Sequence, residues 1–140
     1  MLAEVLPPQE PNLADAQATL TRVFGHSAFR GLQADVVAQI LAGGDALAVL
    51  PTGGGKSVCY QIPALLRQGV GIVVSPLIAL MTDQVEALLA AGVRAARLDS
   101  SMAWEDKQAV FSALEAGRLD LLYVSPEGLS SGALVERLSR

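Results

Sequence analysis

The sequence is poor in several kinds of residue, and each shortage narrows what the chain can be. It contains one cysteine, Cys59, so an internal disulfide is excluded and a reducing compartment is favoured. Charged residues make up 17% and hydrophobic residues 51%, a balance that excludes intrinsic disorder. No apolar stretch approaches the ~20 residues that a membrane span needs. The first residues carry acids and prolines in place of a basic and apolar leader, so no secretory signal is expected.

Positive charge is also scarce. Ten lysines and arginines face fourteen aspartates and glutamates, and the formal net charge is −4. Only two lysines occur, Lys56 and Lys107. A dedicated nucleic-acid module usually carries a net positive charge, so the balance counts against that class. A chain of 140 residues is the size of one domain and can bury a real core. The composition therefore favours a cytoplasmic α/β domain.

Apolar runs and helical patterns alternate along the chain. Residues 1–11 are rich in proline and are expected to form a flexible arm, which leaves 12–140 as one domain. The expected helices cover 13–24, with Asn12 as N-cap, then 32–41, a stretch from about 56, 77–89, 104–114 and the tail from 131. The expected strands cover 46–50, 71–74, 93–98 and 121–124. Short strands separated by helices of ~10–15 residues predict a parallel sheet with right-handed crossovers.

A glycine-rich segment between an expected strand and an expected helix gives the strongest functional signal. Its residues are Thr52, Gly53, Gly54, Gly55, Lys56 and Ser57. Glycines let backbone N–H groups turn toward a phosphate, Lys56 would bring a positive charge to the β- and γ-phosphates, and Ser57 would bind Mg²⁺. A simple strand-to-helix turn is the alternative interpretation. The Gly-Lys-Ser ending in this context predicts a nucleoside-triphosphate site.

Around this loop the chain resembles the front of a RecQ-family ATP-dependent DNA helicase. Four segments carry the resemblance, in order: Phe-Gly-x-x-x-Phe-Arg-x-x-Gln (24–33), Pro-Thr-Gly-Gly-Gly-Lys-Ser-Val-Cys-Tyr-Gln-Ile-Pro-Ala-Leu (51–65), Val-Val-Ser-Pro-Leu-Ile-Ala-Leu-Met-x-Asp-Gln-Val (73–85) and Leu-Leu-Tyr-Val-Ser-Pro-Glu (121–127). In this class the first glycine of the loop is commonly an apolar residue, which fits Leu50. The resemblance implies ATP as the nucleotide and a RecA-like P-loop fold. That fold is an α/β parallel sheet with flanking helices, of which 12–140 would be an incomplete N-terminal portion.

The first of these segments resembles the family's adenine-reading motif. Gln33 can both donate and accept through its amide, as the edge of adenine requires. Arg30 could support this contact, and His26 stands where the family places a ring stacked on the base. Without the motif, Gln33 would be interpreted as a solvated helix residue, and His26 fits a surface loop equally well. The resemblance implies that all three residues bind the cofactor.

Two Ser-Pro pairs follow expected strands. Ser75 with Pro76, and Ser125 with Pro126, are each expected to begin a helix or turn, with Ser as N-cap and Pro at the first helical position. Helix initiation alone would explain either pair. Both lie at the carboxyl ends of parallel strands, the edge where such folds bind ligands. The resemblance implies that they contact the backbone of single-stranded DNA, without reading its sequence.

Other residues give weaker signals. The face formed by Trp104 and Phe111 is expected to join the core, and Asp83 and Glu86 are expected to be solvated. Gly128 stands where the family typically has an arginine. No Asp-Glu pair occurs in the chain, whereas RecQ-type helicases carry one in an Asp-Glu-Ala-His stretch beyond the point where this chain ends. We therefore expect the chain to lack the C-terminal motor lobe and to be inactive alone in hydrolysis and unwinding.

The expected function is that of the ATP-binding and DNA-contacting part of a 3′–5′ DNA helicase that acts in recombination and repair. Lys56 is the catalytic candidate, ATP and Mg²⁺ are the expected cofactors, and single-stranded DNA or duplex junctions are the expected partners. No membrane is involved, and the expected location is the bacterial cytoplasm at the nucleoid. A P-loop phosphotransferase and a non-catalytic ATP-binding module remain as alternatives, which DNA-dependent ATP turnover would distinguish.

Overall fold

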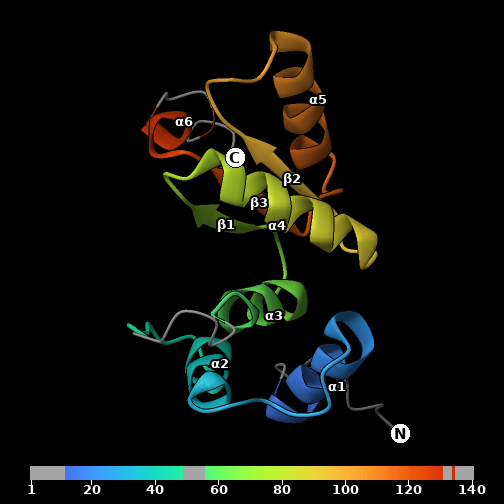
Figure 1. The fold of residues 1–140 in the computed structure, drawn as a ribbon, viewed down its shortest axis with the longest axis vertical. Coiled ribbons are helices and arrows are strands. Elements are labelled where there is room, and N and C mark those ends of the chain that lie inside the picture. The colour runs from blue at the N-terminus through green and yellow to red at the C-terminus, as the bar shows by residue number, and fades with distance from the viewer. Residues whose placement is uncertain (1–11, 49–55, 131–133, 135–140) are drawn as a thin grey trace, which may run out of the picture. The chain divides into compact units, whose positions relative to one another are not determined.

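The computed structural model describes residues 12–48, 56–130 and 134 of the chain (Figure 1). They fall into two compact units, which divide at residue 67. Within the described residues, the elements of the first unit are helices, and the second unit contains a parallel sheet with its helices.

Three helices build the first unit: α1 (Leu13–Phe24), α2 (Gln33–Leu41) and α3 (Val58–Leu66). The start of α1 is fixed by a capping box, in which the Asn12 side chain accepts from the Asp15 N–H and the Asp15 carboxylate accepts from the Asn12 N–H. The helix ends at Gly25, which adopts the left-handed conformation (φ 73°) that glycine tolerates. These local signals define both ends of α1 as expected.

The core of the first unit lies where the three helices meet, because α3 packs against both α1 and α2. Its buried side chains come from all three helices: Ala16, Leu20, Val37, Leu41, Val58 and Ile62. The strand expected at 46–50 is wrong over its described residues, since 46–48 form no strand and Leu47 is 96% exposed; 49 and 50 lie outside the described residues. Among the described residues no neighbouring strand pairs with this segment, so nothing buries its apolar side chains.

The second unit contains a three-stranded parallel sheet of the order β1-β3-β2. The elements follow one another as β1 (Gly71–Val74), α4 (Ile78–Ala90), β2 (Ala95–Leu98), α5 (Trp104–Glu115), β3 (Leu121–Val124) and α6 (Pro126–Ser130). Val74, Val124 and Leu98 are paired in register, so all three strands end at the same edge of the sheet. This is the α/β architecture with flanking helices that the alternating pattern predicts.

The two faces of β3 carry different helices, because side chains alternate along a strand. Leu122 and Val124 belong to a cluster with Phe111 of α5 and with Leu98 of β2. Tyr123 points to the other face, where its hydroxyl donates to the Gln84 side chain of α4 over 2.8 Å. All four residues of β3 are buried, which explains why the sequence of this strand is an uninterrupted apolar run.

The tail helix expected from 131 lies outside the described residues, apart from Leu134, which is helical and buried.

Candidate functional site

The expected nucleotide-binding residues that the structure describes all belong to the first unit. Thr52, Gly53, Gly54 and Gly55 lie outside the described residues. Lys56 is exposed and Ser57 is half-buried, immediately before α3 begins at Val58. Ser57 occupies the N-cap position of α3, and its side chain makes no capping hydrogen bond within the described part of the helix. A lysine and a hydroxyl at a helix start suit a phosphate with Mg²⁺, so these two residues fit the expected cofactors.

Gln33 is not a solvated helix residue. Only 4% of it is exposed, at the first position of α2. Its side-chain oxygen accepts from the backbone N–H of Arg30 over 2.8 Å, which closes the turn before the helix. The amide of Gln33 therefore fixes the shape of the preceding loop. A donor on adenine would share this oxygen with the Arg30 N–H, because an amide oxygen accepts through two lone pairs.

The loop between α1 and α2 is held on α1 by polar contacts and on the core by an aromatic ring. The Gln17 side-chain amide donates to the Ser27 carbonyl over 2.8 Å, and the Thr21 hydroxyl donates to the His26 carbonyl over 3.0 Å. Phe29 packs against the cluster of apolar residues from α1, α2 and α3. The His26 side chain stays exposed, as both interpretations of this residue require. The expected adenine segment is thus anchored in the same unit in which α3 begins directly after Lys56 and Ser57.

Cys59 follows the loop by three residues and is buried in α3. Burial raises the pKa of its thiol, although a backbone hydrogen bond acts in the opposite direction. A thiol with a raised pKa is a poor nucleophile at neutral pH. Cys59 therefore packs as an apolar residue of α3.

In the second unit, three polar residues follow the three strands at the same edge. Ser75 follows β1, Ser125 follows β3 and Asp99 follows β2. The Ser75 N–H donates to the Val124 carbonyl over 2.9 Å, and the Ser125 N–H donates to the Leu98 carbonyl over 3.3 Å. The backbone ladder therefore continues one residue beyond the strands. It places Ser125 between the other two residues.

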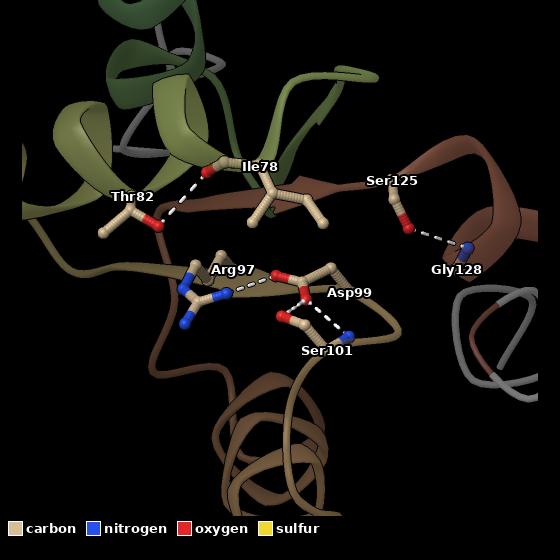
Figure 2. A network of polar contacts seen from close by, with 7 residues as sticks. All are labelled: Ile78, Thr82, Arg97, Asp99, Ser101, Ser125 and Gly128. Atoms are coloured by element: carbon tan, nitrogen blue, oxygen red, sulfur yellow. Dashed lines mark hydrogen bonds and ion pairs between the residues drawn. The ribbon is translucent and has the colours of Figure 1, made fainter.

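The two Ser-Pro pairs differ in structure. Ser125 is the N-cap of α6, because its hydroxyl oxygen accepts from the Gly128 N–H over 3.0 Å and Pro126 is the first helical residue (Figure 2). The same expectation for Ser75 is wrong, since α4 begins two residues after Pro76 and has Leu77 at its N-cap. The Ser75 hydroxyl oxygen accepts from the Leu77 N–H over 3.3 Å and forms a turn ahead of the helix. Pro76 and Pro126 are both exposed.

Asp99 is a residue of this edge that the sequence reasoning missed. Its side chain is fully buried and accepts from the Arg97 guanidinium and from both the N–H and the hydroxyl of Ser101, as Figure 2 shows. Burial alone raises the pKa of this carboxyl, but the hydrogen bonds from Ser101 and the ion pair with Arg97 outweigh it, so the pKa lies below its ordinary value. A charged Asp99 thus holds the loop between β2 and α5 in place. In the sequence, the three consecutive polar residues 99–101 after the expected strand were the available signal for this role.

An ion pair at the amino ends of the strands joins Arg94 to Asp120 over 2.9 Å. The backbone N–H of Arg94 donates to the same carboxylate over 3.0 Å. The hydrogen bond from the guanidinium lowers the pKa of the Asp120 carboxyl. Because more than half of the Arg94 side chain is exposed, solvent screens this pair, and we assign it a structural role only.

Trp104 also departs from expectation. Phe111 is buried as predicted, but Trp104 is 65% exposed and lines a pocket at the end of β2. Asp83 and Glu86 are exposed, as expected. None of the described helices is both long enough and apolar enough to span a bilayer.

Comparison with known proteins gives a family and several relatives. The DEAD/DEAH box helicase family matches residues 30–139. The chain is 48% identical over 124 residues to an ATP-dependent DNA helicase RecQ of Haemophilus influenzae, which covers 89% of this chain and 20% of that protein. It is 45% identical over 123 residues to a probable ATP-dependent DNA helicase RecS of Bacillus subtilis, which covers 87% and 24%. The chain therefore spans about a fifth of the length of these relatives.

Proposed function

Because the chain belongs to the DEAD/DEAH box helicase family, we propose that it is the ATP-binding and DNA-contacting N-terminal portion of a RecQ-like 3′–5′ DNA helicase. Its role would lie in recombination and repair, in the bacterial cytoplasm at the nucleoid. The observation that carries the proposal is that the Phe29-Arg30…Gln33 segment belongs to the three-helix unit whose third helix begins directly after Lys56 and Ser57. A base-reading segment joined to a phosphate-binding lysine is what a nucleotide-driven motor requires.

In this proposal the first unit binds ATP. The backbone of Thr52, Gly53, Gly54 and Gly55 would surround the phosphates, and Lys56 would neutralise their charge as the catalytic candidate. Ser57 would bind Mg²⁺, which neutralises charge that develops on the phosphate oxygens. Gln33 and Arg30 would read the edge of adenine, with His26 stacked on its face. The exposed state of Lys56 and His26 and the half-buried state of Ser57 support this assignment.

The second unit would contact a single DNA strand through the edge at which its strands end. Ser75 and Ser125 lie next to each other there, each beside an exposed proline, Pro76 or Pro126. Contacts from hydroxyls and backbone N–H groups hold a phosphodiester without a net positive charge, which agrees with the formal charge of −4. Such contacts track the strand without reading its sequence.

Hydrolysis and unwinding would need groups that the 140 residues do not contain. The sequence has no Asp-Glu pair to hold the metal and orient water. An arginine finger from a second motor lobe contributes about 10³–10⁵ in rate in related phosphoryl transfer. We propose that a C-terminal helicase lobe supplies that arginine and that the present chain binds its ligands without turnover.

A pair of binding titrations tests this function. Fluorescent ATP and a fluorescein-labelled single-stranded oligonucleotide are titrated separately with the purified chain, and anisotropy is recorded. The helicase proposal predicts that both ligands bind, and that oligonucleotides of different sequence bind alike. Binding of ATP without any binding of DNA would contradict it and would favour a phosphotransferase or a simple ATP-binding module.

A further inference from the structure

A pocket of about 250 Å³ opens in the second unit beside the edge that carries Ser125. Its walls come from the end of β2, the first two turns of α5 and the first turn of α6. The volume lies just below the ~300–1,000 Å³ of pockets for drug-sized ligands. It is therefore suited to a single flat ring system.

One wall of the pocket is an apolar face of α5. Trp104, Lys107 and Phe111 follow the i, i+3, i+7 spacing that places residues on one side of a helix. Phe111 is buried and belongs to the core beneath the pocket, together with Leu98. Trp104 extends the same face into solvent, where 65% of it remains exposed. An indole at the mouth of a pocket with an apolar floor is a platform on which another aromatic ring can stack.

The opposite wall is polar and lies close to the end of β2. Gly128 permits this approach, since a Cβ at this position would lie 3.1 Å from the Ser125 hydroxyl oxygen and 3.2 Å from the Leu98 carbonyl oxygen. Glu127 brings a carboxylate to this wall, and Lys107, a half-buried residue, adds a positive charge from the α5 side. Donors and acceptors thus surround an apolar floor. A nucleobase presents the matching combination of a π-face and a hydrogen-bonding edge.

We propose that the Trp104 pocket receives one unpaired nucleobase of the DNA strand whose backbone lies along Ser125 and Pro126. The inference rests on the proposed DNA-binding function and adds a stacking site to it. The position supports it, because Gly128 lines the pocket and its N–H donates to the Ser125 hydroxyl oxygen. The local charges support stacking rather than phosphate binding, since the lining carries Lys107 and Glu127 with opposite charges and the Asp99 carboxylate is paired with Arg97. The base enters between Trp104 and the α6 wall, and the sugar-phosphate stays at the edge of the sheet.

Trp104 is the only tryptophan of the chain, so its fluorescence reports on this pocket directly. The purified chain is titrated with an oligothymidylate and with an abasic strand of the same length, while anisotropy of a fluorescein label follows binding. Stacking predicts that Trp104 fluorescence is quenched by the oligothymidylate and stays nearly unchanged with the abasic strand. Trp104→Ala should weaken oligothymidylate binding about 5- to 100-fold, and Trp104→Phe should restore part of the affinity.

Leu89→Ala is the matched control, because Leu89 is a 53% exposed apolar residue of α4, distant in sequence from the pocket. It should leave oligonucleotide affinity unchanged. Tight binding without quenching, or equal affinity of Trp104→Ala and the unaltered chain, would overturn the stacking site and leave the DNA-binding function standing. Equal quenching by the abasic strand would also overturn it and would assign the pocket to another occupant, such as an apolar side chain of a protein partner. Absence of binding by either strand would contradict the DNA-binding function itself.

Discussion

Replacing Asp99 with Asn should destabilise the second unit, because it removes a buried charge with three hydrogen-bond donors aimed at it. The Asp99 side chain is fully buried and accepts from Arg97 and twice from Ser101. Asn keeps one acceptor oxygen but replaces the other with an NH2 group, which donates and therefore cannot accept from these donors. Removing one partner of a fully buried ion pair costs about 3–5 kcal/mol. Since 32% of the Arg97 side chain is exposed, its guanidinium can turn to water, and we expect a smaller loss of about 1.5–3 kcal/mol.

The loss should depend on pH in a defined direction. The folded-state pKa of Asp99 is lowered, so its contribution to stability is present above the unfolded-state pKa of about 3.9 and disappears as the pH falls through the folded value. Asn does not titrate. The difference in the free energy of unfolding between Asp99→Asn and the unaltered chain should therefore be largest near neutral pH and should shrink in acid.

Urea unfolding followed by far-UV circular dichroism, at several pH values, measures this difference. Asp83→Asn is the matched control, because it removes the same charge from an exposed position of α4. If Asp99→Asn destabilises no more than Asp83→Asn at neutral pH, the carboxylate does not hold the loop between β2 and α5. A loss that stays constant from neutral to acid pH would show that packing, and not charge, is responsible.

Substitutions in the first unit should change its stability and its nucleotide binding. Asn12→Ala removes the side-chain cap of α1 and should lower its stability by about 1 kcal/mol in urea unfolding, whereas Asn12→Asp should not. Gln33→Ala should reduce the preference for ATP over GTP more than the affinity for phosphate, and an unchanged ratio in competition binding would remove Gln33 from the base site. The 140-residue chain should release no phosphate from ATP, with or without single-stranded DNA. Release that DNA stimulates and that Lys56→Ala abolishes would show the chain to be a complete motor.

The elements that the sequence predicted well are those with local signals at their ends. Asn12 and Asp15 form a capping box and Gly25 a left-handed cap, so α1 lies where the pattern placed it. The apolar run at 121–124 predicts β3, because a central parallel strand is buried on both faces. The N-cap expected at Ser75 was wrong, because its hydroxyl makes a turn contact in place of a cap, and the two uses of a serine hydroxyl look alike in sequence.

The candidate site was predictable where a motif carries it and not where packing decides. The Gly-Lys-Ser ending and the two Ser-Pro pairs are visible in the sequence, and the adjacency of Ser75 and Ser125 follows from the parallel pairing of β1 with β3. Helical spacing places Trp104 and Phe111 on one face, but it does not determine which of the two is buried in the core. Asp99 escaped notice because a single acid after a strand resembles a solvated loop residue. Its role depends on Arg97, whose side chain reaches it only in the folded sheet.

The most direct test of the central claim is the affinity of the chain for fluorescent ATP before and after Lys56→Ala. One charge-assisted contact to phosphate contributes about 1.5–3 kcal/mol, so the dissociation constant should rise about 10- to 100-fold. Arg22→Ala removes one positive charge from an exposed position in the last turn of α1, in the same unit, and should leave the dissociation constant unchanged. Equal dissociation constants for Lys56→Ala and the unaltered chain would contradict the account.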